Sequence, residues 1–281
     1  MLFLIDTYSI LYRLFFALPK LSYNGIQLNS IYGISKLMIK LTKQYRPKYL
    51  AFCIDKGRSN RNEVIKEYKM NRKPTLDEFK QQIPIFYEFA NSAGFMVYGI
   101  DNLEADDVIF TLTRIFKNQS EIYVLTGDKD LLQVIDDNVN VLLMKKGITD
   151  IDFFNYINFE KEFGFCSKFY PYYKALVGDP SDNIKGVKGI GPKKATQILK
   201  NIQSLEEIYK HLSPSETKIF NDNLSVIILK DYSKNLKIEI NLDDLKVVYD
   251  WYKNEEFVKF LKNYSFVSIL NEVEDKQLKL F

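Results

Sequence analysis

Nine carboxylates lie in the first two-thirds of the chain, just after apolar runs, and no histidine lies among them. They are Asp6, Asp55, Glu104, Asp106, Asp107, Asp128, Asp130, Asp179 and Asp182. Gathered acidic side chains repel one another, so a folded protein tolerates them only if hard cations such as Mg²⁺ neutralise the pocket. Two such ions about 4 Å apart could hold a phosphate and activate water for its hydrolysis. The pattern predicts a divalent-metal site with oxygen ligands.

Helix capping is the simpler explanation for some of these acids. Residues 104–107 open a predicted helix, where carboxylates gain from the helix dipole and can accept hydrogen bonds from free amides. However, paired acids beside a glycine recur at 127–130 and at 178–182. Three such clusters exceed what capping requires, so the set favours metal binding. The single histidine, His211, lies away from every cluster and is expected at the surface or in packing.

A glycine- and lysine-rich run spans residues 186–194. Its glycines would let the backbone approach a phosphate, and the helix that follows would supply amide donors, as in a helix-hairpin-helix turn. A plain connector between two helices is the alternative, and the lysines favour nucleic acid. The residues predicted to contact it are Gly186, Lys188, Gly189, Gly191, Lys193 and Lys194.

A second basic segment, residues 56–73, directly follows Asp55. It carries Lys56, Arg58, Arg61, Lys66, Lys69, Arg72 and Lys73 against two acids. A solvated helix face is the ordinary outcome for such a run. Its position next to Asp55 instead places it over the predicted metal site, where positive charge can steer phosphate and stabilise a transition state. Tyr68 could stack on an unpaired base.

Composition limits the class of protein. The 281 residues carry a formal net charge of +3 and two distant cysteines, which indicates a globular protein without a disulfide framework or zinc finger. The apolar N-terminus is interrupted by Asp6 and lacks a preceding basic residue, so it predicts a buried strand and not a signal peptide. No apolar stretch approaches the ~20 residues of a membrane span. We expect a cytoplasmic protein.

Short apolar runs alternate with helical patterns and predict an α/β fold with a mostly parallel central sheet. The expected strands are 1–5, 49–54, 95–98, 121–125 and 139–144, and the expected helices are 30–45, 76–92 and 104–117. Ligands bind at the carboxyl ends of such strands, where Asp6, Asp55 and Asp128 fall. We predict an α/β domain over 1–167, with a basic helical arch at about 56–85. A smaller helical nucleic-acid-binding subdomain is predicted over 168–270, with a short extended segment within 236–248. Residues 271–281 are predicted to form a tail.

An ordered series of motifs then resembles one family. The motifs are Leu4-Ile5-Asp6, Leu11-Tyr12-Arg13, residues 15–19, Tyr68-Lys69-Met70-Asn71-Arg72, Glu104-Ala105-Asp106-Asp107, residues 126–131, and residues 178–184 leading into Gly189-Ile190-Gly191. Over nearly all of residues 1–270 the chain is similar to the 5′-nuclease superfamily, which has a PIN-like fold. The similarity is to the bacterial 5′–3′ exonuclease or flap endonuclease domain found at the N-terminus of DNA polymerase I. The small residues that commonly follow the first aspartate are replaced by Thr7 and Tyr8.

The resemblance implies a Mg²⁺-dependent phosphodiesterase, with Mn²⁺ as a substitute, that removes RNA primers and 5′ flaps from DNA and acts at nicks. It implies that Asp6, Asp55, Glu104 and Asp106 surround one metal, that Asp106, Asp128, Asp130 and one of Asp179 or Asp182 lie near the other, and that Asp107 supports them. Lys69 and Arg72 would contact phosphate and join Asp6 and Asp106 in catalysis. Arg13, Arg61, Lys66, Tyr68 and Lys73 would also contact DNA, and a K⁺ ion could bind the carbonyls of the hairpin.

The last residues resemble the bacterial sliding-clamp binding pentapeptide. Gln277, Leu278, Leu280 and Phe281 would dock into a clamp, and a frayed terminus is the alternative. No polymerase sequence follows, and we expect a monomeric stand-alone nuclease or an excised domain. Two other functions stay open. A catalytically silent adaptor would hold DNA junctions for a partner, and a related ribonuclease would act on structured RNA.

Overall fold

A six-stranded sheet forms the centre of the protein in a computed structural model that describes residues 1–57, 65, 70, 74–147 and 149–274. Its strand order is β5-β4-β1-β6-β7-β8, and neighbours run parallel except for β7 and β8. The strands are β1 (Leu2–Asp6), β4 (Tyr49–Cys53), β5 (Met96–Tyr98), β6 (Ile122–Thr126), β7 (Val139–Lys146) and β8 (Asp150–Phe154). The five expected strands and the mostly parallel sheet are confirmed. The antiparallel strand β8 was not predicted.

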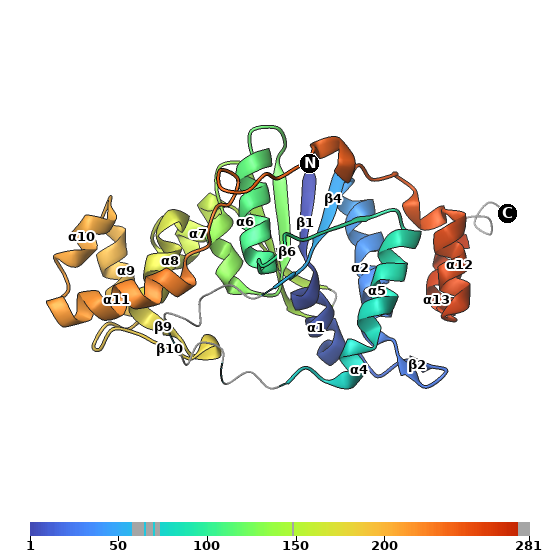
Figure 1. The fold of residues 1–281 in the computed structure, drawn as a ribbon, viewed down its shortest axis with the longest axis horizontal. Coiled ribbons are helices and arrows are strands. Elements are labelled where there is room, and N and C mark those ends of the chain that lie inside the picture. The colour runs from blue at the N-terminus through green and yellow to red at the C-terminus, as the bar shows by residue number, and fades with distance from the viewer. Residues whose placement is uncertain (58–64, 66–69, 71–73, 148, 275–281) are drawn as a thin grey trace.

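Helices cover both faces of the sheet because its central strands are apolar on both sides (Figure 1). Phe3 and Ile5 of β1 face a core that includes α1 (Thr7–Ala17), α2 (Asn29–Tyr45) and α5 (Gln82–Ser92). Leu2 and Leu4 face the opposite core, which includes α6 (Ala105–Phe116). Helices α2 and α6 confirm two of the predicted helical stretches.

The third predicted helix, residues 76–92, is divided into α4 (Asp77–Lys80) and α5. Pro84 lies close to the break and has no N–H, so it cannot donate to the carbonyl of Lys80 as a continuous helix would require. Gln82, at the start of α5, is buried and accepts a hydrogen bond of 3.0 Å from the backbone N–H of Ser30. A small hairpin of β2 (Ser22–Tyr23) and β3 (Ile26–Gln27) precedes α2.

The helical part of the chain extends one of the two cores beyond the edge of the sheet (Figure 1). Its elements are α7 (Tyr156–Phe163), α8 (Tyr170–Val177), α9 (Pro192–Lys200), α10 (Leu205–Tyr209) and α11 (Pro214–Ile227). A two-stranded hairpin, β9 (Gly178–Asp179) with β10 (Ile184–Lys185), connects α8 toward α9. Within 236–248 the expected extended segment joins the sheet through one isolated bridge, between Lys246 and Tyr49.

The last two helices return to the α/β part. Helix α12 (Glu255–Asn263) packs on α5, and α13 (Val267–Glu274) is tied to α2 by ion pairs from Glu272 to Lys36 and Lys43 at 2.7 and 3.2 Å. The predicted domain boundaries at 167 and 270 stay predictions, while the packing places residues 255–274 against the α/β part. None of the helices in the described residues is both long and apolar enough to cross a membrane.

Candidate metal centre and nucleic-acid interface

Asp6 lies at the carboxyl end of β1, where it is only 4% exposed. The hydroxyl of Thr126, at the end of the neighbouring strand β6, donates a hydrogen bond of 2.7 Å to Oδ2 of Asp6. Burial raises the pKa of Asp6 to about 7, and the negative charges of Asp128 and Asp55 add to the effect, although the Thr126 hydrogen bond opposes it. The structure therefore brings three of the predicted acids into one electrostatic group.

Asp55 connects this group to the start of α6. It follows β4 by two residues, and its Oδ1 accepts a hydrogen bond of 2.9 Å from the backbone N–H of Ala105, the first residue of the helix. Glu104 and Asp106 flank Ala105 and are half-buried. Asp55 thus holds the first turn of α6 beside the end of β4. The acids at 104 and 106 therefore lie at the same edge of the sheet as the carboxyl ends of β1 and β4.

Asp128 links the first group of acids to a second one. Its backbone N–H donates to the hydroxyl of Thr126 at 2.9 Å, and its Oδ1 accepts from the N–H of Asp130 at 2.8 Å. The charge of Asp128 contributes to a raised pKa at both Asp6 and Asp130. One loop after β6 thus carries acids that face both groups.

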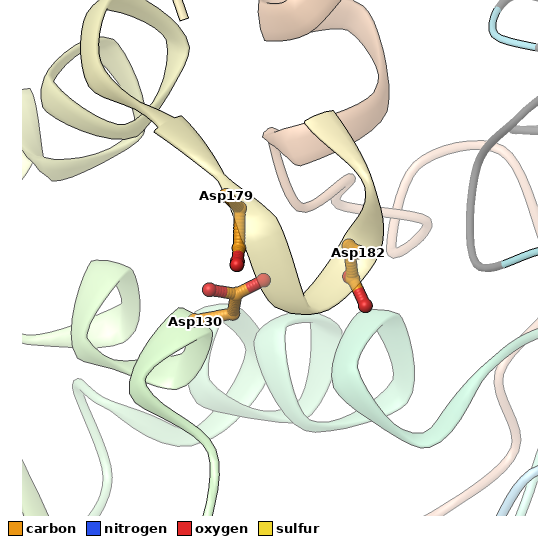
Figure 2. A group of neighbouring side chains, drawn as sticks. All are labelled: Asp130, Asp179 and Asp182. Atoms are coloured by element: carbon orange, nitrogen blue, oxygen red, sulfur yellow. The ribbon is translucent and has the colours of Figure 1, made fainter. Parts of the chain in front are cut away.

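The second group consists of Asp130, Asp179 and Asp182, whose carboxylate oxygens include a set that all lie within 4.8 Å of one another. Figure 2 shows Asp130 and Asp179 approaching each other from different elements, with Asp182 beside them. Asp130 belongs to a short 3-10 helix after β6, Asp179 ends β9, and Asp182 belongs to the turn that follows β9. Asp179 is held by hydrogen bonds from the N–H and the hydroxyl of Ser181, at 2.9 and 2.6 Å.

Lys174 is a member of this second group that sequence analysis missed. Its ammonium on α8 donates to both Asp130 and Asp179, and the residue is 9% exposed. Burial raises the pKa of Asp130 to about 6 although Lys174 opposes this shift. At Asp179 burial is outweighed, and Lys174 holds the pKa below its ordinary value. A lysine among apolar helix residues, five positions before an aspartate, is the signal that could have identified it.

This donor set suits a hard divalent cation. All of its ligating atoms are carboxylate oxygens, the type that Mg²⁺ and Mn²⁺ prefer. The raised pKa of buried Asp6 shows that its charge is poorly compensated by the protein. In the second group the ammonium of Lys174 pairs with Asp130 and Asp179, and an oxygen of Asp182 lies within 4.8 Å of oxygens of both. Added positive charge would therefore stabilise the ionised form of both groups.

Asp107 is placed differently from the other predicted ligands. It is fully buried on α6, and its Oδ1 accepts a hydrogen bond of 3.0 Å from the backbone N–H of Lys230. Consecutive helix residues point about 100° apart, so Asp106 and Asp107 face different surroundings. The predicted supporting role of Asp107 at the metals stays a prediction.

Arg13 is bound to the protein backbone in this structure. Its two terminal nitrogens donate to the carbonyls of Lys145 at 2.5 Å and Gly127 at 2.7 Å. A Cβ on Gly127 would lie 2.5 Å from Nε of Arg13, so a side chain there would displace the guanidinium. Arg13 thereby fixes the loop that carries Asp128, and its predicted contact with DNA stays a prediction.

The glycine- and lysine-rich run lies between α8 and α9. Gly186 packs against the backbone of α8, because a Cβ there would lie 2.2 Å from the carbonyl oxygen of Val177. Val187 is buried, and its N–H donates to Leu176 at 2.8 Å. The predicted contact residues that are exposed are Lys188, Gly189, Gly191, Lys193 and Lys194. Gly191 is the N-cap of α9, so the free amides at the start of that helix lie close in the chain to the three exposed lysines.

Comparison with known proteins agrees with this arrangement. Residues 1–164 match the family model "5'-3' exonuclease, N-terminal resolvase-like domain", and residues 167–250 match "5'-3' exonuclease, C-terminal SAM fold". The chain belongs to the 5′–3′ exonuclease family. The similarity to the 5′-nuclease family seen in the sequence is thereby confirmed.

Individual relatives support the family membership. A 5′–3′ exonuclease of Aquifex aeolicus is 36% identical over 254 residues, which cover 88% of this chain and 86% of the relative. DNA polymerase I of Caldicellulosiruptor bescii is 38% identical over 97% of this chain, and the match spans only 33% of that polymerase. The flap endonuclease of bacteriophage T5, solved in a pseudo-enzyme–product complex with DNA and metal ions, shares the fold with a TM-score of 0.57 at 18% identity. That match covers 99% of this chain and 98% of the phage chain.

Some of the predicted functional residues lie outside the described residues. They are Arg61, Lys66, Tyr68, Lys69, Arg72 and Lys73 of the predicted arch, and Gln277, Leu278, Leu280 and Phe281 of the predicted clamp-binding tail. Their roles stay predictions. His211, by contrast, is described and exposed, as expected for a residue without a catalytic role.

Proposed function

We propose that this chain is a Mg²⁺-dependent 5′–3′ exonuclease and flap endonuclease that hydrolyses DNA, and the RNA of primers, at 5′ ends and junctions. The observation that supports this most strongly is the convergence of Asp6, Asp55 and Asp128 at one sheet edge, with Asp128 linked to a second acid group through Asp130. A divalent cation, when bound, supplies positive charge that neutralises the scissile phosphate and acidifies water.

We infer one ion for each of the two groups of acids. Asp6, Asp55, Glu104 and Asp106 would hold one of them, and Asp128, Asp130, Asp179 and Asp182 would hold the other. Thr126 orients Asp6 and the backbone of Asp128 through one hydroxyl, so it would keep the two groups in a fixed relation. The T5 flap endonuclease, whose fold is similar, was solved with metal ions, which supports the placement of metals in this fold.

The exposed surface around Gly189, Gly191 and the three lysines would bind the backbone of the downstream duplex. Amide donors at a helix N-terminus and nearby ammonium groups bind phosphate without reading sequence. A K⁺ ion on the carbonyls of this hairpin would add to the binding. Lys69 and Arg72 of the basic arch would hold the scissile phosphate on the 5′ strand.

The chain spans about a third of the DNA polymerase I relatives that it matches, so its partners are proposals as well. We place the protein in the cytoplasm, at the nucleoid, as a monomer that acts in replication and repair. Residues 277–281 would bring it to the replication fork by binding the sliding clamp.

The decisive experiment uses a labelled 5′-flap duplex with and without Mg²⁺. The wild-type protein should cut the flap strand near the junction, and a chelator should abolish cutting. Asp128→Ala should abolish cleavage while DNA binding is kept. Binding without any cleavage in ample Mg²⁺ would contradict the proposal and favour the junction-binding adaptor.

A second comparison distinguishes DNA from RNA as the duplex substrate. DNA and RNA duplexes of the same sequence are titrated at one stated salt concentration, because phosphate contacts make affinity strongly salt-dependent. Tighter binding to DNA is expected. Equal or tighter binding to RNA would favour a ribonuclease.

A further inference from the structure

The segment that leaves α11 crosses from the helical part to the acid site. Residues 228–232, here called the strap, follow Ile227 at the end of α11 and contact α6 and the 3-10 helix at 129–134. Within the described residues, three buried side chains bind its backbone: Asp107, Thr111 and Gln133. None of these three contacts could be predicted from local sequence.

Gln133 joins the strap to the helix that carries Asp130. Its Nε2 donates to the carbonyl of Asp130 at 2.9 Å and to that of Ile227 at 3.3 Å. Its Oε1 accepts from the N–H of Leu229 at 3.0 Å. One amide group thus bridges the backbone of a proposed metal ligand and the end of α11.

Asp107 and Thr111 join the strap to α6, one helical turn apart. Oδ1 of Asp107 accepts from the N–H of Lys230 at 3.0 Å. The hydroxyl of Thr111 accepts from the N–H of Tyr232 at 3.1 Å and donates to the carbonyl of Lys230 at 3.4 Å. The first turn of this helix carries Asp106, with Glu104 just before it.

The C-terminal half of α11, one turn before the strap begins, is tied to the proposed duplex-binding hairpin. Asn223 is buried, and its Nδ2 donates to the carbonyls of Ala175 at 3.0 Å and Lys185 at 2.8 Å. Ala175 belongs to α8, and Lys185 ends β10 just before the glycine- and lysine-rich run. Helix α11 and the strap therefore form a continuous hydrogen-bonded connection from the hairpin to both groups of acids.

We infer that Asp107, Thr111 and Gln133 are positioning residues that couple duplex binding at the hairpin to the placement of the metal-binding acids. This inference rests on the proposed nuclease function. It assigns Asp107 to the strap and not to the metals. Breaking the strap contacts should uncouple the two regions while each keeps its own structure.

Thr111→Val tests the coupling, because valine keeps the shape of threonine and removes both hydrogen bonds. Two substrates are compared in Mg²⁺: a 5′ flap with a downstream duplex, and a single strand of the flap sequence. We expect the variant to lose about threefold to tenfold in flap cleavage and to cut at more positions, with single-strand cleavage within about twofold of wild type. Thr111→Ser, which keeps the hydroxyl, should restore both rate and position.

Thr113→Val is the matched control. Thr113 is equally buried on the same helix, but its hydroxyl donates to Phe110 of that helix at 2.6 Å. It should leave the ratio of flap to single-strand cleavage unchanged. An equal fall on both substrates in Thr111→Val, or the same change in Thr113→Val, would overturn the coupling.

A second readout does not depend on cleavage. In Ca²⁺, binding of a DNA duplex should slow amide hydrogen exchange across 104–116 and 129–134 in wild type, and this protection should be lost in Thr111→Val. If the wild-type protein cuts nothing, the proposed function fails, and the exchange data still decide whether the strap couples the regions. Equal protection in both proteins refutes the coupling.

Asp107→Asn separates the two roles of that residue. Asparagine keeps an oxygen that can accept from Lys230, so a strap contact should survive and the half-saturating Mg²⁺ concentration should stay within about twofold. A rise of tenfold or more would assign Asp107 to the metals.

Discussion

Replacing Lys174 by methionine should make the stability of the protein depend on Mg²⁺ more strongly than in wild type. The ammonium of Lys174 lies between Asp130 and Asp179, and the three side chains are only 11%, 16% and 13% exposed. Removing one partner of a buried ion pair typically costs 3–5 kcal/mol, because the remaining charge is left uncompensated. Ser181 still donates two hydrogen bonds to Asp179, so we expect a loss at the lower end, about 3 kcal/mol.

Divalent ions should recover most of that loss. With the ammonium gone, a cation bound by Asp130, Asp179 and Asp182 takes over the neutralisation and no longer competes with Lys174. In chelator the variant should melt roughly 6 °C or more below wild type, and saturating Mg²⁺ should narrow the gap to about 1 kcal/mol. The assay is denaturant and thermal unfolding of both proteins across a Mg²⁺ titration.

Lys117→Met provides the control, since Lys117 pairs with Asp136 away from the acid groups and Arg114 still pairs with Asp136 at 2.9 Å. It should cost no more than about 1 kcal/mol, with no dependence on Mg²⁺. If Mg²⁺ stabilises wild type and Lys174→Met by the same amount, Lys174 does not share a site with the metal and the electrostatic argument is wrong.

Three further substitutions test other contacts. Thr126→Val removes the donor to Asp6, at 2.7 Å, and should reduce Mg²⁺-dependent cleavage about tenfold with the unfolding temperature nearly kept. Gly178→Ala places a Cβ 2.4 Å from the backbone nitrogen of Gly186, at a residue whose φ is 84°. The free energy of unfolding, measured with denaturant, should therefore fall by more than about 2 kcal/mol. Gel-shift titration should also show weaker binding of the duplex. Asp136→Asn should cost about 1 kcal/mol near pH 7, because, although burial opposes them, Lys117 and Arg114 lower the pKa of Asp136. This difference should begin to shrink near pH 3.8 and disappear as the pH falls through the lowered pKa of the folded state.

Each of these has an outcome that contradicts it. Unchanged cleavage in Thr126→Val would show that Asp6 does not need its hydrogen bond. Gly191→Ala is the control for Gly178→Ala, because a Cβ at Gly191 meets nothing within 4 Å, and equal stability losses in both would refute the close-contact argument. If the difference in unfolding free energy between wild type and Asp136→Asn persists in acid, it does not come from the ion pairs of the ionised Asp136 carboxylate.

Much of the sheet could be predicted from the sequence because its strands are continuous apolar runs. A parallel strand buried on both faces must be apolar along its length, as β4 is and as β1 is up to Ile5, with Asp6 at its carboxyl end. The edge strand β8 was missed, since its residues Asp150–Phe154 are short, partly charged and only partly buried. Its pairing depends on the turn that returns it to β7, and local composition does not reveal that turn.

The candidate site was predictable in its residue types and not in its internal contacts. Asp6 and Asp128 lie at or just after the carboxyl ends of predicted strands, so their convergence follows from the fold class. Lys174 could not be assigned to the site in this way, because its carboxylate partner Asp130 lies 44 residues away. Helix geometry points Asp106 and Asp107 in different directions, but only the tertiary structure shows that the partner of Asp107 is the backbone of Lys230.

The sequence by itself determined where the strands lie, which acids follow them, and that oxygen-ligated cations suit those acids, because burial patterns and ligand chemistry are properties of the residues themselves. The tertiary structure alone decided which acid meets which partner. The contacts of Lys174 with Asp130, of Arg13 with Gly127 and of the strap with α6 join residues far apart in the chain. Such contacts depend on how whole elements pack, and the packing energy is shared by many residues, so no local pattern encodes them.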